Sequence, residues 1–306
     1  MRAAAESLES GGVIGSTRLF QWYAKLRRSD RGIKAGTYML RRDAGWNSVL
    51  AALRSGRGVV NTVTIPEGYT LAQIEPLLAG RLGVPPESLR AAVSDTAVLQ
   101  RLDVPTSTVE GYLFPDTYLF PPGTSARAAV LTMVRRFEQA WRPEWTARLD
   151  TMVLSRHDLL TLASIVEREA KKPEERPVIA AVYWNRLRNG MLLQADPTVQ
   201  YALPQYQKRL LNKHLSVKSR YNTYKYPGLP PGPIASPGIA SIRATLYPAA
   251  APYLYFVAHP DGHHEFRVKL AEHNAAVRVA RRAWDAVRKQ QRLDSLKAAK
   301  ARRSGD

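Results

Sequence analysis

Cysteine is absent from the 306 residues, which excludes disulfides, thiolate catalysis and cysteine-ligated zinc sites. The chain also lacks an apolar run of about 18 residues, the length that predicts a membrane-spanning helix. Residues 1–16 (MRAAAESLESGGVIGS) have no apolar core like that of a secretory signal. These absences leave the compartment in which the protein works undetermined.

Several common catalytic motifs are missing as well. The sequence contains no HExxH, no G-x-S-x-G and no GxxxxGK[ST], which argues against the usual zinc-protease, serine-hydrolase and nucleotide-binding classes. Three histidines do cluster, at His259, His263 and His264. A proline, an aspartate and a glycine lie among them, so the segment is more typical of a turn than of a metal site.

Acidic residues are scarce compared with basic ones. The 26 Asp and Glu face 45 Lys and Arg, which gives a net charge of +19. Such an excess predicts an anionic partner, namely nucleic acid, a lipid surface or an acidic polymer. Much of the excess lies in residues 278–303, a composition typical of a solvated helix. The hydrophobic content of 45% is that of a folded protein with one large or two ordinary domains.

Periodicity predicts a mixture of helices and short strands, and therefore the α+β class. Helical patterns occupy residues 19–26, 48–53, 70–82, 86–93, 126–140, 155–171, 177–188 and the basic segment after 274. The helix at 155–171 begins with Ser155 and Asp158 in capping-box spacing. Strand patterns occupy residues 59–65, 253–257 and 265–268, the last two as a hairpin. Residues 104–124 and 221–237 are expected to be loops, the second of them long and rich in proline and glycine.

Two glutamates stand out in residues 162–170 (LASIVEREA). On a helical wheel, Glu167 and Glu169 occupy the two shoulders of one apolar stripe, which is formed by Leu159, Leu162, Ala163, Val166 and Ala170. Shoulder carboxylates are common on surface helices. Alternatively, a shoulder that faces a cleft is desolvated, which raises the pKa of its carboxyl group and makes it a general acid. The helical wheel gives no reason to prefer one glutamate over the other.

Further polar groups follow this helix. Asn185 lies on the next predicted helix, and Gln194, Asp196 and Thr198 come soon after it. Asp196 would allow a glycosidase that uses two carboxylates. The tyrosines of residues 221–226 lie among basic residues, an arrangement that suits stacking on nucleic-acid bases or on sugar rings equally well.

Seven motifs in order strongly resemble the endolytic murein transglycosylases of the MltG/YceG-like family. They are TIPEGYT (64–70), EGYLFPDTY (110–118), LASIVERE (162–169), VYWNRL (182–187), LQADPTVQYAL (193–203), YNTYKYPGLPPGPIASPG (221–238) and YLYFV (253–257). Together they extend the resemblance over roughly residues 13–280.

The resemblance implies a lytic transglycosylase, a lyase of the peptidoglycan cell wall. It would cut glycan strands internally between MurNAc and GlcNAc, leave 1,6-anhydroMurNAc ends, and terminate strands beside penicillin-binding peptidoglycan synthases. It implies Glu167 as the catalytic residue, no metal or organic cofactor, and no nucleic-acid partner. The substrate-binding positions would be Asn185, Gln194, Asp196, Thr198, Tyr221, Asn222, Thr223 and Tyr224. Candidates of second rank are Glu110, Asp116 and Glu169.

The resemblance also implies a domain plan. We expect a disordered segment at 1–12, an N-terminal region at 13–103 with a LysM-like module at about 59–95, a catalytic domain at 104–277, and a basic helical tail at 278–306. Family members are anchored in the inner membrane by an N-terminal helix, with the enzyme on the periplasmic face. This chain shows no such helix, so we expect its anchor to lie outside the given start.

Two other functions stay open at the level of the residues. One is a peptidoglycan-binding module without activity, and the other is a hydrolytic muramidase that uses Asp196 as its second carboxylate. A basic nucleic-acid-binding protein is the reading that charge alone would favour.

Overall fold

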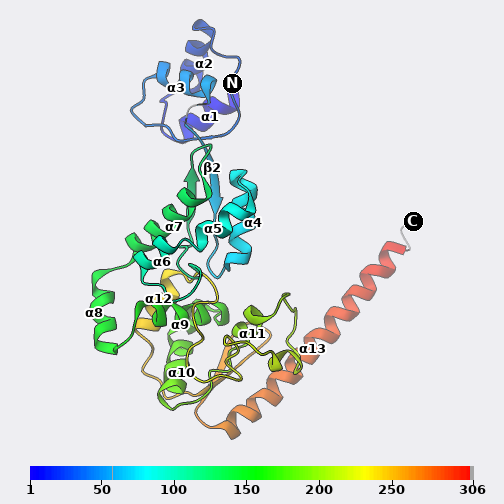
Figure 1. Cartoon of the computed structure of the whole chain (residues 1–306). Coiled ribbons are helices and arrows are strands. Elements are labelled where there is room, and N and C mark those ends of the chain that lie inside the picture. The colour runs from blue at the N-terminus through cyan, green and yellow to red at the C-terminus, as the bar shows by residue number, and fades with distance from the viewer. Residues whose placement is uncertain (57, 304–306) are drawn as a thin grey trace. The chain divides into compact units, whose positions relative to one another are not determined.

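In the computed structural model, which describes residues 1–56 and 58–303, with side chains up to 295, the chain forms two compact units (Figure 1). Unit 1 contains residues 1–65, 74–92 and 116–130, and unit 2 contains residues 66–73, 93–115 and the chain from 131 onward. Both helices and strands are present, which confirms the α+β class.

The helices are α1 (Arg2–Ser10), α2 (Thr17–Leu26), α3 (Trp46–Ser55), α4 (Leu71–Leu82), α5 (Pro86–Val93), α6 (Thr96–Leu102), α7 (Ala126–Ala140), α8 (Pro143–Met152), α9 (Arg156–Glu169), α10 (Arg176–Arg188), α11 (Asp196–Ala202), α12 (Ile239–Leu246) and α13 (Leu270–Arg303). The strands are β1 (Thr37–Tyr38), β2 (Val59–Thr64), β3 (Thr117–Phe120), β4 (Tyr255–Ala258) and β5 (His264–Arg267). Short 3₁₀ turns lie at Pro173–Glu175 and His214–Ser216.

Unit 1 is built on an antiparallel sheet with the order β1-β2-β3. Val63 points into the core while Thr62 and Thr64 are exposed, as alternation along a half-buried strand requires. The hydroxyl groups of Thr64 and Thr117 lie 2.9 Å apart across the β2–β3 pair. Ile74 and Leu78 of α4 and Leu89 of α5 are fully buried.

The N-terminal residues of unit 1 fold into helices. Residues 1–12 were expected to be disordered, but residues 2–10 form α1, because Ala5 and Leu8 pack into a core with α2 and α3. Phe20 meets Trp46 edge to face in that core, with ring centroids 5.6 Å apart.

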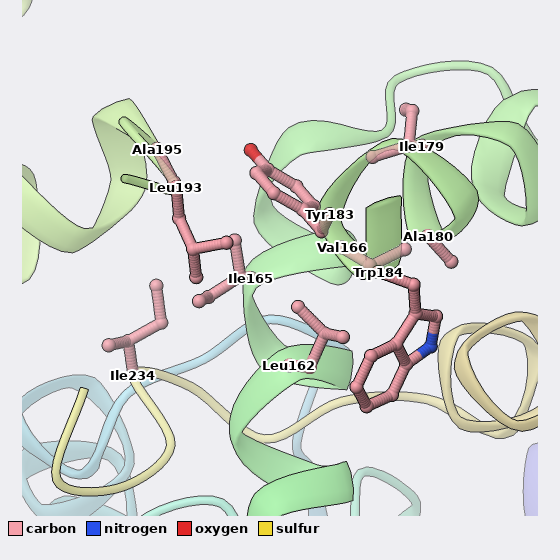
Figure 2. Close-up of a cluster of buried hydrophobic side chains, with 10 residues drawn as sticks. All are labelled: Leu162, Ile165, Val166, Ile179, Ala180, Tyr183, Trp184, Leu193, Ala195 and Ile234. Carbon is pink, nitrogen blue, oxygen red and sulfur yellow. The ribbon is translucent and has the colours of Figure 1, made fainter. Parts of the chain in front are cut away.

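Unit 2 is organised around α9. The predicted capping box is confirmed, since the Ser155 hydroxyl accepts from the Asp158 amide and the Asp158 carboxylate accepts from the Ser155 amide. The helix packs against α10, α11 and α12. Figure 2 shows the apolar cluster that results, in which Leu162, Ile165 and Val166 of α9 meet Tyr183 and Trp184 of α10. This packing fixes the C-terminal end of α9.

The β4–β5 hairpin and α13 complete unit 2. The hairpin packs against α10 and against the beginning of α13. Trp284 of α13 donates its indole N–H to the Ala258 carbonyl at 3.1 Å. Beyond Trp284 the helix continues away from the hairpin (Figure 1), and residues 288–295 are exposed. Within the described residues, no helix has the length and apolarity needed to cross a membrane.

Besides α1, five of the described helices and strands were not predicted from the sequence: α6, β3, α8, α11 and α12. Strand β3 lies in the segment 104–124 that was expected to be a loop, and it forms because its four residues pair with β2. Residues 221–237 contain turns and bends but neither helix nor strand.

Candidate active site

The two glutamates at the end of α9 face different surroundings. They are two residues apart, so their side chains project about 200° apart around the helix. Nine residues of α9 are buried, from His157 to Val166, and both glutamates lie just beyond this buried stretch. The hydrogen-bond partners and the burial of each carboxyl group therefore depend on which part of unit 2 lies on its side of the helix.

Glu167 is held in an ion pair. Its Oε1 lies 3.4 Å from a guanidinium nitrogen of Arg176, and its Oε2 accepts a hydrogen bond from the Gly238 amide at 3.0 Å. The side chain is 7% exposed. Both carboxylate oxygens thus face protein donors, and the contact with Arg176 is the longer of the two.

A third carboxylate, Glu67, lies beside this ion pair. Burial, followed by the charge of Glu167, raises the pKa of Glu67. Gly238 is required here, because a Cβ at that position would lie 1.8 Å from the Glu67 Oε1 atom. The Glu167 side of α9 is therefore closely packed against residues 67–68 and the start of α12.

Glu169 has a different environment. Its Oε1 accepts a hydrogen bond from the Tyr183 hydroxyl at 2.9 Å. Burial, with a further contribution from the charge of Asp196, raises the pKa of Glu169 to about 7. The carboxyl group is therefore largely protonated in mildly acidic solution and about half protonated at neutral pH.

Glu169 opens onto a cavity of about 550 Å³. Its walls are formed by α9, α10 and the β4–β5 hairpin, and α13 contributes one side. The lining residues are Glu169, Tyr183, Arg186, Leu193, Gln194, Asp196, Tyr224, Phe256, Val257, Ala258, His264, His273 and Val277. The mixture of apolar surface, aromatic rings and a few polar groups is that of a small-molecule or saccharide pocket.

Asp196 and Gln194 lie on the cavity wall as the sequence predicted. The Tyr224 hydroxyl donates to the Asp196 carboxylate at 2.6 Å. Gln194 has a left-handed backbone, with φ of 52°, a conformation that costs free energy for any residue with a Cβ and is concentrated at functional sites. Its Oε1 accepts from Arg186 at 3.2 Å.

Four of the predicted substrate-binding residues do not line the cavity but form hydrogen bonds to the backbone or to each other near it. Thr198 and Thr223 are buried with their hydroxyls 2.9 Å apart, and the Thr223 hydroxyl accepts from the Ala195 amide at 3.0 Å. Asn222 is fully buried and donates its amide to the carbonyls of residues 215 and 217. Asn185 donates to the carbonyls of residues 251 and 253. None of these four lines the cavity.

Three predicted residues lie away from the cavity. Both Glu110 oxygens accept from the Leu71 amide at 3.1 Å, which caps the start of α4. Tyr201 donates to Glu110 at 3.3 Å and packs on Tyr221, with ring centroids 4.8 Å apart. Asp116 belongs to unit 1, where it accepts from the Thr117 amide. Neither Tyr221 nor the two carboxylates line the cavity that contains Glu169.

Sequence reasoning missed several cavity residues, including Tyr183, Arg186 and His273. Tyr183 lies inside the helix predicted at 177–188, and His273 lies between the predicted hairpin and the basic segment after residue 274, so neither belonged to a pattern that pointed to a site. The His259, His263 and His264 group pairs with carboxylates, His264 with Glu175 at 2.6 Å. Within the described part of the chain, no set of three His, Cys, Asp or Glu residues is placed to hold a metal ion.

Comparisons with known proteins agree with one another. A family model described as the YceG-like family matches residues 1–279. A Bacillus subtilis protein named endolytic murein transglycosylase is 36% identical over 290 residues, which cover 90% of this chain and 80% of that protein. A Streptococcus pneumoniae protein of the same name is 31% identical over 283 residues, which cover 82% of this chain but only 51% of that protein. A crystal structure of a YceG-like protein from Listeria monocytogenes matches with a TM-score of 0.68 at 32% identity, covering 89% of this chain and 93% of that chain.

Proposed function

Because the chain belongs to the YceG-like family, we propose that it is an endolytic murein transglycosylase, an enzyme that cleaves the glycan strands of peptidoglycan internally. Relatives that carry this name match most of the chain. The cavity beside Glu169 supplies a pocket of suitable size and character for part of a glycan.

Glu167 carries the acid/base role in this proposal, because it is the glutamate to which the family resemblance points. Its side chain is 7% exposed and lies between the Arg176 guanidinium and the Gly238 amide. Glu67 lies beside it, and burial, followed by the charge of Glu167, raises the pKa of Glu67. Glu169 is the second candidate, because it lines the cavity and its pKa is raised to about 7.

The reaction needs one residue that first donates and then accepts a proton. Protonated Glu167 gives its proton to the glycosidic oxygen while the bond to the MurNAc anomeric carbon breaks through an oxocarbenium-like state. The resulting carboxylate takes the proton of the MurNAc C6 hydroxyl as that oxygen attacks the anomeric carbon. The 1,6-anhydro bond forms, the leaving strand ends in a hydroxyl group, and Glu167 is protonated again.

The Glu169 cavity is proposed to hold part of the glycan. Asp196, which accepts from the Tyr224 hydroxyl, places a polar group on the cavity wall, where we expect it to contact the saccharide. Tyr183 orients the Glu169 carboxyl through its hydrogen bond. Since the C6 hydroxyl is the nucleophile and is already attached to the sugar, no second carboxylate is needed to activate water.

Paired substitutions on the same helix test the assignment. We expect Glu167→Gln to lower the release of anhydro-muropeptides from purified murein sacculi by about 100-fold or more, because the acid is removed. Glu169→Gln should keep most of the activity of its folded fraction. Mass spectrometry of the digests identifies the product ends. The reverse ranking of the two variants would move catalysis to Glu169, and reducing ends from the native protein would establish a muramidase.

The strand and helices at residues 59–93 support a second part of the proposal, a LysM-like glycan-binding module. Strand β2 is followed by α4 and α5, and β3 returns to pair with β2. We expect added glycan fragments to shift the NMR signals of residues 59–93 in the full-length Glu167→Gln protein. Shifts confined to the Glu169 cavity would contradict a binding module.

The place of action follows from the substrate. Murein lies outside the cytoplasmic membrane, so the proposal places the enzyme at the periplasmic face of the inner membrane, where penicillin-binding synthases make new strands. Fractionation of cells followed by crosslinking should recover the protein with membranes and with a synthase. Recovery in the cytosol alone would contradict this placement.

A further inference from the structure

Helix α2 presents an apolar stripe on the surface of unit 1. Phe20 and Ala24 face the core that α2 shares with α1 and α3 (Figure 1). On the opposite side of the helix, Leu19, Trp22 and Leu26 are 60%, 64% and 64% exposed. Their spacing of three and four residues places all three within about 60° of one another around the helix. Single exposed apolar residues are ordinary, but a tryptophan and two leucines on one stripe indicate a contact face.

Basic side chains border this stripe. Arg18 and Lys25 are exposed and lie along one edge of it, within about 60° of its nearest member around the helix. Residues 17–56 carry nine Lys and Arg but only two Asp and Glu. One of the two acids, Asp43, is paired with Arg41 at 2.7 Å. The contact face is therefore apolar along its centre and positively charged at its edge.

A hollow of about 640 Å³ continues the stripe at the C-terminal end of α2. Its lining includes Leu26, which belongs to the stripe, and three arginines, Arg27, Arg28 and Arg54. The Arg54 guanidinium donates to the Ser29 hydroxyl at 3.3 Å, which holds it at the end of the helix. Among the described residues, no carboxylate forms an ion pair with any of these arginines. Guanidinium groups around one hollow suit a phosphate group, because their N–H donors match its oxygens in pairs.

Arg28 occupies a backbone position that glycine usually takes. Its φ is 51°. Its amide donates to the Lys25 carbonyl at 2.9 Å, and the Ser29 amide donates to the Ala24 carbonyl at 2.8 Å. These are the two hydrogen bonds that end a helix with a left-handed residue, for which a side chain is unfavourable. The chain therefore keeps a guanidinium group at the hollow at a position where glycine would be less strained.

We propose that the contact face, made of the α2 stripe and the arginine hollow, docks on the surface of an anionic phospholipid bilayer. The apolar side chains enter the boundary between headgroups and acyl chains, as those of interfacial helices do, and the arginines bind lipid phosphates. Tryptophan suits this boundary, because its ring is apolar and its indole N–H is polar. A bilayer supplies an apolar layer and an anionic layer side by side, which is the pattern of charge and apolarity that the face complements. The inference concerns unit 1 alone and is independent of which glutamate is catalytic.

Vesicle binding tests the contact face. The full-length protein is sedimented with vesicles of phosphatidylcholine alone or of phosphatidylcholine mixed with phosphatidylglycerol. We expect binding to the mixed vesicles to be tighter by roughly 10-fold or more and to weaken as salt is added. The double variant Trp22→Ser, Leu26→Ser should bind the mixed vesicles roughly 10-fold more weakly than the native protein. Both side chains are exposed, so the variant should keep its fold, which circular dichroism checks.

Matched charge variants separate the hollow from general attraction, since the chain carries a net charge of +19. Arg28→Gly removes one guanidinium and should leave stability little changed, because glycine fits the left-handed turn. We expect it to weaken binding to the mixed vesicles by roughly 3- to 10-fold. Arg292→Gln removes an exposed charge from α13 and should change binding by less than about 2-fold. Equal losses in these two variants would mean that net charge alone attracts the protein, and would overturn the arginine hollow.

Quenching of tryptophan fluorescence locates the contact. Within the described chain, Trp22 is the one tryptophan that is exposed. Mixed vesicles with bromine on their acyl chains should quench the native emission, and Trp22→Phe should abolish most of that quenching. Equal quenching in both proteins, or equal affinity of the native protein and the double variant for mixed vesicles, would overturn the docking face. None of these measurements requires cleavage of murein, so a failure of the proposed function is recognised separately, by the absence of anhydro-product from the native protein.

Discussion

Glu169 and Asp196 line the same cavity, and their charges are coupled. The negative charge of Asp196 adds to the effect of burial on the pKa of Glu169. The Glu169 carboxyl group therefore keeps its proton to a higher pH than an exposed glutamate does, and we expect Asp196 to help set that limit.

Replacing Asp196 with asparagine should move that limit. Without the charge, the pKa of Glu169 should fall by roughly half a unit to one unit. Asparagine keeps an oxygen that accepts from Tyr224, which limits the structural disturbance. An NMR titration of the Glu169 side-chain carboxyl carbon between pH 4.5 and 8.5 measures the shift. The same midpoint in both proteins would show that Asp196 does not influence this carboxyl group.

The choice between Glu167 and Glu169 shows what the sequence could predict about the site. Periodicity places both carboxyl groups on the shoulders of one apolar stripe and makes them equivalent. They are distinguished by groups that are distant in sequence, Gly238 for Glu167 and the hairpin-walled cavity for Glu169. Four residues of the motifs that match the family do not line the cavity but form hydrogen bonds in the loops around it: Asn185, Thr198, Asn222 and Thr223.

Among the elements, the turn before β3 has a position that only glycine can occupy. Gly111 has a φ of 83°, and a Cβ added to it would lie 2.3 Å from the Cβ of Pro233. The Pro/Gly-rich segment thereby packs directly on the backbone of residues 110–112.

Gly111→Ala is expected to destabilise the protein by about 2–4 kcal/mol, because left-handed strain and a steric overlap act together. Gly190→Ala provides a matched control: its φ is 63°, but nothing lies within 4 Å of the added Cβ. That variant should lose only about 1 kcal/mol. Urea unfolding curves give both values. Equal losses in the two variants would show that the contact with Pro233 contributes nothing.

The elements that the sequence predicted are those whose signals are local. Helix α9 has a capping box and a long periodic pattern, and α10 has a proline near its start. By contrast, β3 has four residues between proline-rich turns and forms only by pairing with β2. Helix α12 has eight residues, most of them buried against α9 and α10, and therefore shows little amphipathic contrast. Such elements depend on tertiary contacts, and the periodicity of the sequence carries no information about those contacts.

At the scale of the whole molecule, the buried carboxyl group of Glu169 makes stability depend on pH. Its pKa is about 7 in the folded protein, compared with an ordinary value of 4.5. Between those two values the unfolded chain releases the proton and the folded chain keeps it, so stability falls as the pH rises through this window. The loss reaches at most about 3 kcal/mol, because one pKa unit corresponds to about 1.4 kcal/mol.

Glu169→Gln should remove this loss. The variant and the native protein should be nearly equally stable at pH 4, and the variant should become more stable as the pH approaches 7.5. Urea unfolding at a series of pH values measures the difference. A constant difference across the series would mean that Glu169 ionises as readily in the folded chain as in the unfolded one.

The end of α13 is expected to contribute charge rather than stability. Residues 288–295 are exposed, whereas Trp284 is tied to the hairpin and lies 5.8 Å from the Lys171 ammonium group. A chain that ends at residue 288 should keep its Tm within about 2 °C and show a weaker salt dependence of binding to sacculi. A chain that ends at residue 280 loses Trp284 and should melt several degrees lower. Similar melting temperatures for the two shortened chains would contradict this division of α13.

Glu169 is the last residue of α9. The aligned peptide dipoles of a helix leave partial negative charge at that end, so the backbone itself opposes ionisation of this carboxyl group. The same dipole acts less on Glu167, which lies half a turn earlier and has a guanidinium beside it. A carboxyl placed in the first turn would experience the opposite field and release its proton readily. The length of α9 therefore helps to keep the Glu169 carboxyl group protonated, because a helix that continued for another turn would move its negative end away from Glu169 and leave a stronger acid in the cavity.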